Sequence, residues 1–151
     1  FLAQADTINV SAGNPEIRTI AISGTPTFNF PSANFGGVTS QSIGSVNIKS
    51  NSADGYKLTV ASANVANLKS TINAIDYSIP YTLIYASGNV VIADTTAVTV
   101  ETKAAGAAGY LDCANDSGCD RALALTVTEA NRQAKPSGTY TDTLTVSIAA
   151  P

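Results

Sequence analysis

The most regular pattern in the sequence is an alternation of apolar and polar residues near its end, over residues 138–148. Tyr140, Leu144, Val146 and Ile148 fall on one face of an extended chain, and threonines alternate with them on the other face. A period of two over this length predicts a β-strand, and β-branched threonine favours the same backbone. A strand this regular needs a neighbouring strand, so the identity of its partner is a question about function.

Shorter alternations predict about eight more strands, which are separated by segments rich in Asn, Asp, Gly and Pro. They cover residues 16–23, 27–30, 44–50, 56–61, 76–85, 90–92, 98–100 and 122–128. Residues 62–74 differ, because Val65, Leu68 and Ile72 follow a helical spacing that predicts a single helical turn or an irregular crossover. About nine strands with uneven connections predict an all-β fold, an immunoglobulin-like Greek-key β-sandwich rather than an up-and-down barrel.

The N-terminal stretch is a separate unit in this interpretation. Leu2, Ile8, Val10 and Ala12 share one parity of a loosely alternating arm, and a Gly-Asn-Pro sequence at residues 13–15 interrupts it. We therefore expect an N-terminal extension at residues 1–14, made of an arm and a hinge, and a sandwich domain at residues 15–151. The Ala-Gln-Ala sequence at residues 3–5 resembles a signal-cleavage site, and we expect these residues to belong to the mature protein.

The composition of the chain excludes several classes of function. Charged residues make up 13% of the chain, about half of the usual share, and Thr, Ser and Ala replace them, which is typical of extracellular β-proteins. The net charge of -3 gives no basic surface for nucleic acid. The absence of histidine excludes His-dependent nucleophile triads and imidazole metal ligands. We expect no enzyme activity, no catalytic residues, no metal and no cofactor, and a secreted, cell-surface protein.

Two further features of the sequence bear on the cellular compartment of the protein. Cys113 and Cys119 enclose five polar, turn-forming residues, so in an exported protein they are expected to form a local disulfide at a hairpin tip. A redox or metal-binding pair is the less favoured interpretation, because the spacing matches neither a CxxC motif nor a zinc ribbon. The chain contains no apolar run long enough to span a bilayer.

Some polar and aromatic residues have competing interpretations. Tyr77, Tyr81 and Tyr85 could stack against sugars, but they share a face with aliphatic residues and are expected in the core. Asp142 falls on the inward parity of the closing strand, so it must accept hydrogen bonds from the backbone or from hydroxyls. Tyr140 is placed to make the hydrogen bond of a tyrosine corner.

Several segments together resemble spore coat protein U and the fimbrial subunits of archaic chaperone–usher systems. The resemblance is carried by the motifs at residues 27–30, 45–50, 55–60 and 79–85, and most closely by the ending at residues 137–146. It implies a secreted pilin whose sandwich lacks one strand, which the N-terminal arm of the next subunit supplies. The implied partners are identical subunits in a homopolymer, together with a periplasmic chaperone and an outer-membrane usher. Family members often tie an early strand by a disulfide, whereas these cysteines are late and local, so assembly without an usher stays open.

The leading hypothesis is therefore a structural subunit of an extracellular filament that polymerises by donor-strand complementation. The donor strand would present Leu2, Ile8, Val10 and Ala12, and the acceptor groove would be lined by the closing strand with Tyr140, Leu144, Val146 and Ile148. Such strand addition gives affinity through main-chain hydrogen bonds and specificity through side-chain pockets. Three alternatives remain: an arm that folds back onto its own domain, a self-contained adhesin or carbohydrate-binding module, and a surface-coat protein.

Overall fold

The computed structural model describes residues 7–151, and it is almost entirely β-structure in this range. A five-stranded antiparallel sheet has the order β1-β2-β9-β6-β7, and a three-stranded one has the order β10-β3-β8. A separate hairpin pairs β4 with β5. The strands are β1 (Arg18–Ser23), β2 (Val38–Ser50), β3 (Gly55–Ser62), β4 (Asn67–Ile72), β5 (Ile75–Pro80), β6 (Thr82–Tyr85), β7 (Gly88–Val90), β8 (Val98–Ala104), β9 (Cys119–Val127) and β10 (Leu144–Ala149), with one short helix, α1 (Glu129–Arg132).

The predicted β-sandwich is present in its coarse form, with apolar residues of the sheets forming two core clusters. The first cluster is centred on Val60, Leu83 and Leu125, and the second on Ile48 and Leu58. These side chains alternate with outward-facing polar residues along β2, β3 and β9, as the period of two requires. The predicted core positions of Tyr81 and Tyr85 are confirmed, since both are buried.

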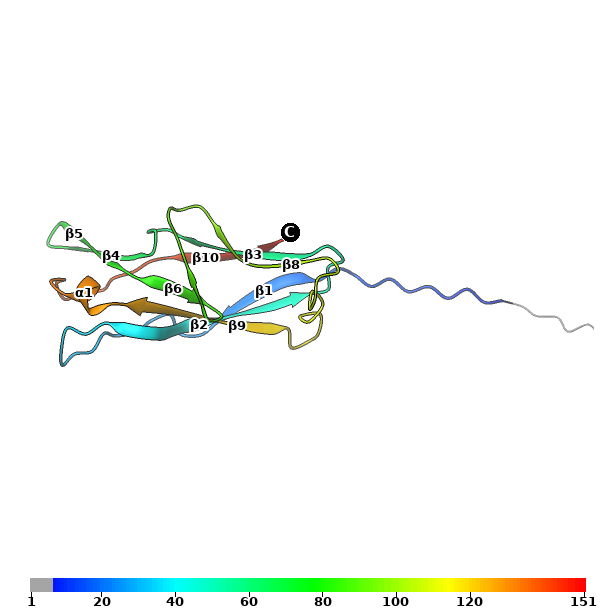
Figure 1. Cartoon of the computed structure of the whole chain (residues 1–151), viewed down its shortest axis with the longest axis horizontal. Helices are drawn as coiled ribbons and strands as arrows, with labels where there is room; N and C mark the ends of the chain where they lie inside the picture. Colours follow the sequence, from blue (N-terminus) through cyan, green and yellow to red (C-terminus); the bar gives the residue numbers. More distant parts are fainter. Residues whose placement is uncertain (1–6) are drawn as a thin grey trace, which may run out of the picture.

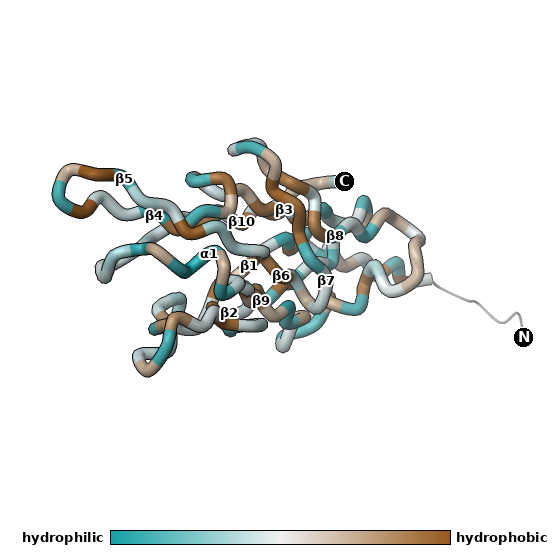
Figure 2. The backbone as a smooth tube through the Cα atoms, turned by 60° about the vertical axis from the view of Figure 1, so that its left-hand side comes forward, coloured by the Kyte–Doolittle hydropathy of each residue, from teal (hydrophilic) through white to brown (hydrophobic). Residues whose placement is uncertain are grey.

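The molecule is elongated, and its two ends differ (Figure 1). We call one end the base: there the N-terminal arm leaves the body, beside the loop at residues 105–118. We call the opposite end the distal end: it carries the β4–β5 hairpin, α1 and the loop at residues 31–37. Figure 2 shows a strongly hydrophobic stretch at the tip of the β4–β5 hairpin, where Ile75 is exposed.

The predicted crossover at residues 62–74 is wrong, because β4 occupies Asn67–Ile72. Leu68 is buried in the first core cluster, and Asn73 and Ala74 both have positive φ angles of 52° and 62°. A two-residue loop with both φ angles positive matches the twist of a tight β-hairpin. Asn at the first loop position tolerates this conformation, but Ala does not signal it in a sequence.

Three other predicted strands differ most from the structure. The stretch predicted as one strand at 76–85 is divided between β5 and β6, which belong to different sheets, and the break follows Pro80, which has no N–H to donate. The closing strand is shorter than predicted, since β10 begins only at Leu144. Residues 27–30 form no strand, and Phe28 and Phe30 instead pack edge to face, with ring centroids 5.3 Å apart.

Candidate functional site

A groove of about 850 Å³ lies between the two sheets, where β1 and β10 form the facing edges. Its floor is apolar and comes from buried residues of both core layers, namely Leu68, Ile79, Tyr81, Leu123 and Leu125. Its walls include Ile22 of β1, the ring of Phe28, and Leu144 and Val146 of β10. The body of the protein therefore contains an apolar surface that its own described residues leave uncovered.

The edge of β10 offers free backbone groups to this groove. The N–H of Ala63 donates to the carbonyl of Thr143 at 2.9 Å, which fixes the phase of the β10–β3 ladder. In an antiparallel pair, alternate residues direct their N–H and C=O groups to opposite sides. Thr145 and Ser147 therefore bond to β3, whereas Leu144, Val146 and Ile148 direct their backbone groups to the open edge.

The edge of β1 has the same arrangement on the other side of the groove. The N–H of Asn51 donates to the carbonyl of Ile17 at 3.0 Å, which fixes the phase of the β1–β2 ladder. Arg18, Ile20 and Ile22 consequently direct their N–H and C=O groups away from β2. In the described chain β1 and β10 are both end strands of their sheets, so each has one edge whose backbone groups are not paired within its sheet.

The sequence-predicted acceptor residues occupy different parts of this site. Leu144 and Val146 are on β10 and line the groove, and Tyr140 lines it from the segment that precedes β10. Ile148 is on the same face of β10 but packs against the second core cluster, nearer the base. The groove lining therefore includes Leu144 and Val146 of β10 but not Ile148, which lies nearer the base.

Polar residues fix the wall that precedes β10. The hydroxyl of Tyr140 donates to the carbonyl of Pro136, four residues upstream, at 2.9 Å, as expected for a tyrosine corner. The carboxylate of Asp142 accepts hydrogen bonds from the hydroxyls of Ser62 and Tyr81, both at 2.6 Å, and from the N–H of Asn64. Burial and this carboxylate raise the pKa of Tyr81. The inward carboxylate is therefore satisfied as predicted, and it joins β10 to the floor of the groove.

The N-terminal arm extends from the base away from the body (Figure 1). Residues 7–17 form no strand, and Ile8 and Val10 are 89% and 90% exposed, while Ala12 is exposed as well. Leu2, the other predicted donor residue, lies outside the described residues. The arm therefore presents two alternating apolar side chains that no part of its own described chain covers.

The root of the arm is fixed to the body by Asn51, a residue that the sequence did not single out. Its side-chain amide donates to the carbonyl of Pro15 at 2.9 Å, and its side-chain oxygen accepts the N–H of Ile17. Glu16 and Arg18 form an ion pair beside it at 2.6 Å. The predicted hinge at residues 13–15 is thus held at its last residue, Pro15.

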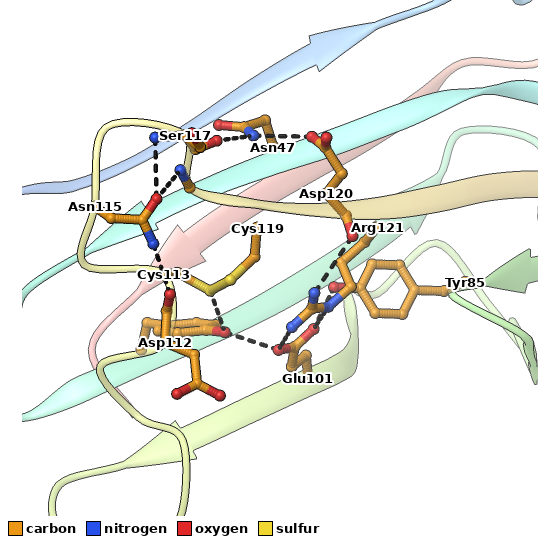
Figure 3. Close-up of a disulfide and its surroundings, with 12 residues drawn as sticks. Asn47, Tyr85, Glu101, Asp112, Cys113, Asn115, Ser117, Cys119, Asp120 and Arg121 are labelled. Carbon is orange, nitrogen blue, oxygen red and sulfur yellow. Dashed lines mark hydrogen bonds and ion pairs between the residues drawn. A yellow bond between two sulfur atoms is a disulfide. The ribbon is translucent and has the colours of Figure 1, made fainter.

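A polar cluster near the base supports the second core (Figure 3). Glu101 forms a bidentate pair with Arg121, at 2.8 and 2.9 Å, and accepts hydrogen bonds from the hydroxyls of Tyr56 and Tyr85. Burial alone would raise the pKa of Glu101, but the hydrogen bonds from Arg121 and the two tyrosines lower it to about 2. Glu101 and Arg121 are distant from each other in the sequence, and no sequence pattern predicted that they would pair.

The predicted disulfide between Cys113 and Cys119 is present in the same region. Asn115 orders the enclosed loop, because its side chain accepts the N–H groups of Ser117 and Gly118 and donates to the carbonyl of Asp112. Within residues 7–151, no three His, Cys, Asp or Glu side chains gather in a way that could hold a metal ion. The disulfide and the Asn115 hydrogen bonds therefore hold this loop together at the base of the body.

No protein-family model matches the chain, and no curated protein matches it either. Across the part of the chain that the structure describes, no helix is long and apolar enough to cross a membrane.

Proposed function

We propose that this protein is a structural subunit of an extracellular filament, in which the N-terminal arm of one copy fills the groove of the next. One observation carries the proposal: the same chain has an open apolar groove between two strand edges and an exposed arm with alternating apolar residues. Each lacks a partner within the described residues, and each has the features that the other requires.

The geometry of the two parts is compatible. Ile8 and Val10 are two residues apart, which is the spacing of Leu144 and Val146 on β10, so their side chains can follow the floor of the groove in register. Residues 7–17 can extend over about 36 Å at about 3.3 Å per residue. Burial of Ile8 and Val10 would contribute about 1.5–3 kcal/mol each.

The shape of the groove favours an open polymer over a closed dimer. Because its lining includes distal residues such as Phe35 and Lys135 but not Ile148 at the base end of β10, an arm would enter from the distal end and bring the base of its own subunit there. Such a contact joins different surfaces of the two copies, and a contact of this kind propagates unless its rotation closes a ring. Secretion is consistent with the disulfide, since such bonds persist in oxidising compartments.

The test uses a subunit that lacks residues 1–12, in which the Asn51 clamp on Pro15 remains intact. A fluorescent peptide of residues 7–17 is titrated onto this subunit, and binding is measured by fluorescence anisotropy. Two variant peptides are compared with the native one. The first carries Ile8→Ser, at a position expected to face the groove, and the matched control carries Asn9→Ser, at a position expected to face away. We expect the Asn9→Ser peptide to bind like the native one and the Ile8→Ser peptide to bind about tenfold or more weakly.

Electron microscopy supplies the second half of the test. The full chain should form filaments, and the truncated subunit should not, unless the peptide is linked to it. Filaments from the truncated subunit, or a peptide that fails to bind, would refute the proposal.

A further inference from the structure

The loop at residues 31–37 holds an apolar side chain out into solvent at the distal end. Phe35 is 69% exposed, and it stands beside the groove, whose lining it joins. Single exposed apolar residues are common on protein surfaces and by themselves need no explanation. The rigidity of this loop is what sets Phe35 apart.

Arg132 fixes the loop from α1. Its guanidinium donates to the carbonyls of Asn34 at 3.0 Å, Gly36 at 2.6 Å and Pro31 at 2.7 Å, and it stacks over the ring of Phe30 at 4.9 Å. The amide oxygen of Asn34 also accepts the N–H of Gly36 at 2.8 Å. A half-buried arginine thus makes three hydrogen bonds that fix the loop backbone on both sides of Phe35 and leave its side chain exposed.

Gly37 extends this attachment. A Cβ at this position would lie 1.9 Å from the carbonyl oxygen of Val127, so the backbone of the loop lies directly against the end of β9. Only glycine permits so close an approach. The loop is therefore fixed at both sides of its tip, and a preorganised loop loses less conformational entropy when it binds a partner.

The base of the body has exposed apolar residues as well. Ile17, at the root of the arm, is 47% exposed, and Leu111, in the turn before Cys113, is 46% exposed. Both segments meet at the end of β2, because Asn51 binds the carbonyl of Ile17 and the N–H of Ser50 donates to the carbonyl of Cys113 at 3.2 Å. We call this surface the base patch.

We propose that Phe35 of one subunit packs against the base patch, Ile17 and Leu111, of the subunit whose arm occupies its groove. The inference rests on the proposed function, and it adds a second contact that is continuous with the arm–groove interface. An arm that enters at the distal end brings its clamped root to the mouth of the groove, which Phe35 lines. Charges also match, since Lys135 lines the groove at this end and Asp112 adjoins Leu111. The contact would fix the angle between successive subunits, which the arm alone leaves free at Gly13.

The experiment separates the Phe35 contact from the arm–groove contact by changing Leu111, which belongs to the base patch but not to the arm. Filaments are assembled from the full chain carrying Phe35→Ser, Leu111→Ser, both changes, or Val91→Ser as a control for loss of an exposed apolar side chain (79% exposed) elsewhere. Rates of subunit dissociation in urea are measured for the filaments. Binding of the peptide of residues 7–17 to each truncated subunit is measured in parallel.

Each single change at the proposed contact should raise the dissociation rate about tenfold, and the double change should do little more, because both remove one contact. Leu111→Ser should leave peptide binding unchanged. Rates equal to that of Val91→Ser, or effects of Phe35→Ser and Leu111→Ser that multiply, would overturn the contact while arm donation stands. If the peptide does not bind and the unmodified chain forms no filaments, the proposed function itself fails.

Discussion

Replacement of Glu101 by Gln tests how the base of the sandwich is stabilised. The Glu101 side chain is only 12% exposed, and its carboxylate accepts hydrogen bonds from both Arg121 and the two tyrosine hydroxyls. Gln has nearly the same shape but no charge, so Glu101→Gln removes the ion pair and keeps the packing. Arg121 then loses its charged partner in a partly buried position, which is strongly destabilising.

The magnitude follows from the pKa. The pKa of Glu101 falls from its ordinary value of 4.5 to about 2 in the folded protein. A folded-state pKa below the unfolded one stabilises the protein above the unfolded value, and this stabilisation is lost as the pH falls through the folded value. The difference corresponds to about 3 kcal/mol at pH 7, at about 1.4 kcal/mol for each pH unit between the two pKa values.

Urea unfolding between pH 7 and pH 2 measures this quantity. The native protein should be about 3 kcal/mol more stable than Glu101→Gln at pH 7, and the difference should shrink to less than about 1 kcal/mol at pH 2. Asp116→Asn, which changes an exposed carboxylate, is the control and should have little effect. A difference between the native protein and Glu101→Gln that stays constant with pH would show that the charge of Glu101 contributes nothing and would refute the reasoning.

Four further predictions concern the edges, the arm root and the turns. In the subunit without residues 1–12, NMR should show faster exchange for the amide protons of Leu144 and Val146 than for those of Thr145 and Ser147. Added peptide of residues 7–17 should slow the exchange of Leu144 and Val146. Equal exchange rates for the two pairs would contradict the hydrogen-bonding phase of the β10–β3 ladder. Asn51→Ala should lower the free energy of unfolding by about 1–3 kcal/mol in urea and speed exchange of the Ile17 amide, because both its bonds to the arm root are lost. Gly24→Ala should lower the free energy of unfolding by about 2 kcal/mol or more, because Gly24 has a φ of 115° and an added Cβ would lie 2.4 Å from the Cα of Gly44. The control Gly13→Ala, which has open space around the added Cβ, should leave the urea midpoint unchanged. Reduction and alkylation of Cys113 and Cys119 should lower the free energy of unfolding by about 2 kcal/mol relative to the disulfide-bonded protein. Thermal unfolding measures the difference, and an unchanged Tm would mean that the loop is ordered without the bond.

Period-two alternation located most strands because one face of each is buried. Core residues such as Leu58, Tyr81 and Leu125 were therefore recognisable from their parity. The strand β4 was missed because its alternation is masked by Asn, Ser and Thr, and because the positive φ of Ala74 has no sequence signal. The division of residues 76–85 between two sheets depends on tertiary packing, to which Pro80 gave only a hint.

The parts of the candidate site differ in how far sequence could reach them. Leu144 and Val146 could be predicted because strand parity determines which side chains face inward. The other walls of the groove could not, because Ile22 and Phe28 come from segments distant from the closing strand. Nor could the contacts of Asn51 and Arg132, since a side chain that binds distant backbone groups leaves no periodic pattern.

The direction of the arm root has a mechanical consequence. The arm leaves the body along its long axis, in line with β1 (Figure 1), so a pull on the arm acts parallel to that strand. The ladder from Arg18 to Ser23 lies across this direction, and its hydrogen bonds to β2 would be sheared together instead of opening one after another. The joint between the arm and the body is therefore oriented to resist tension along the long axis.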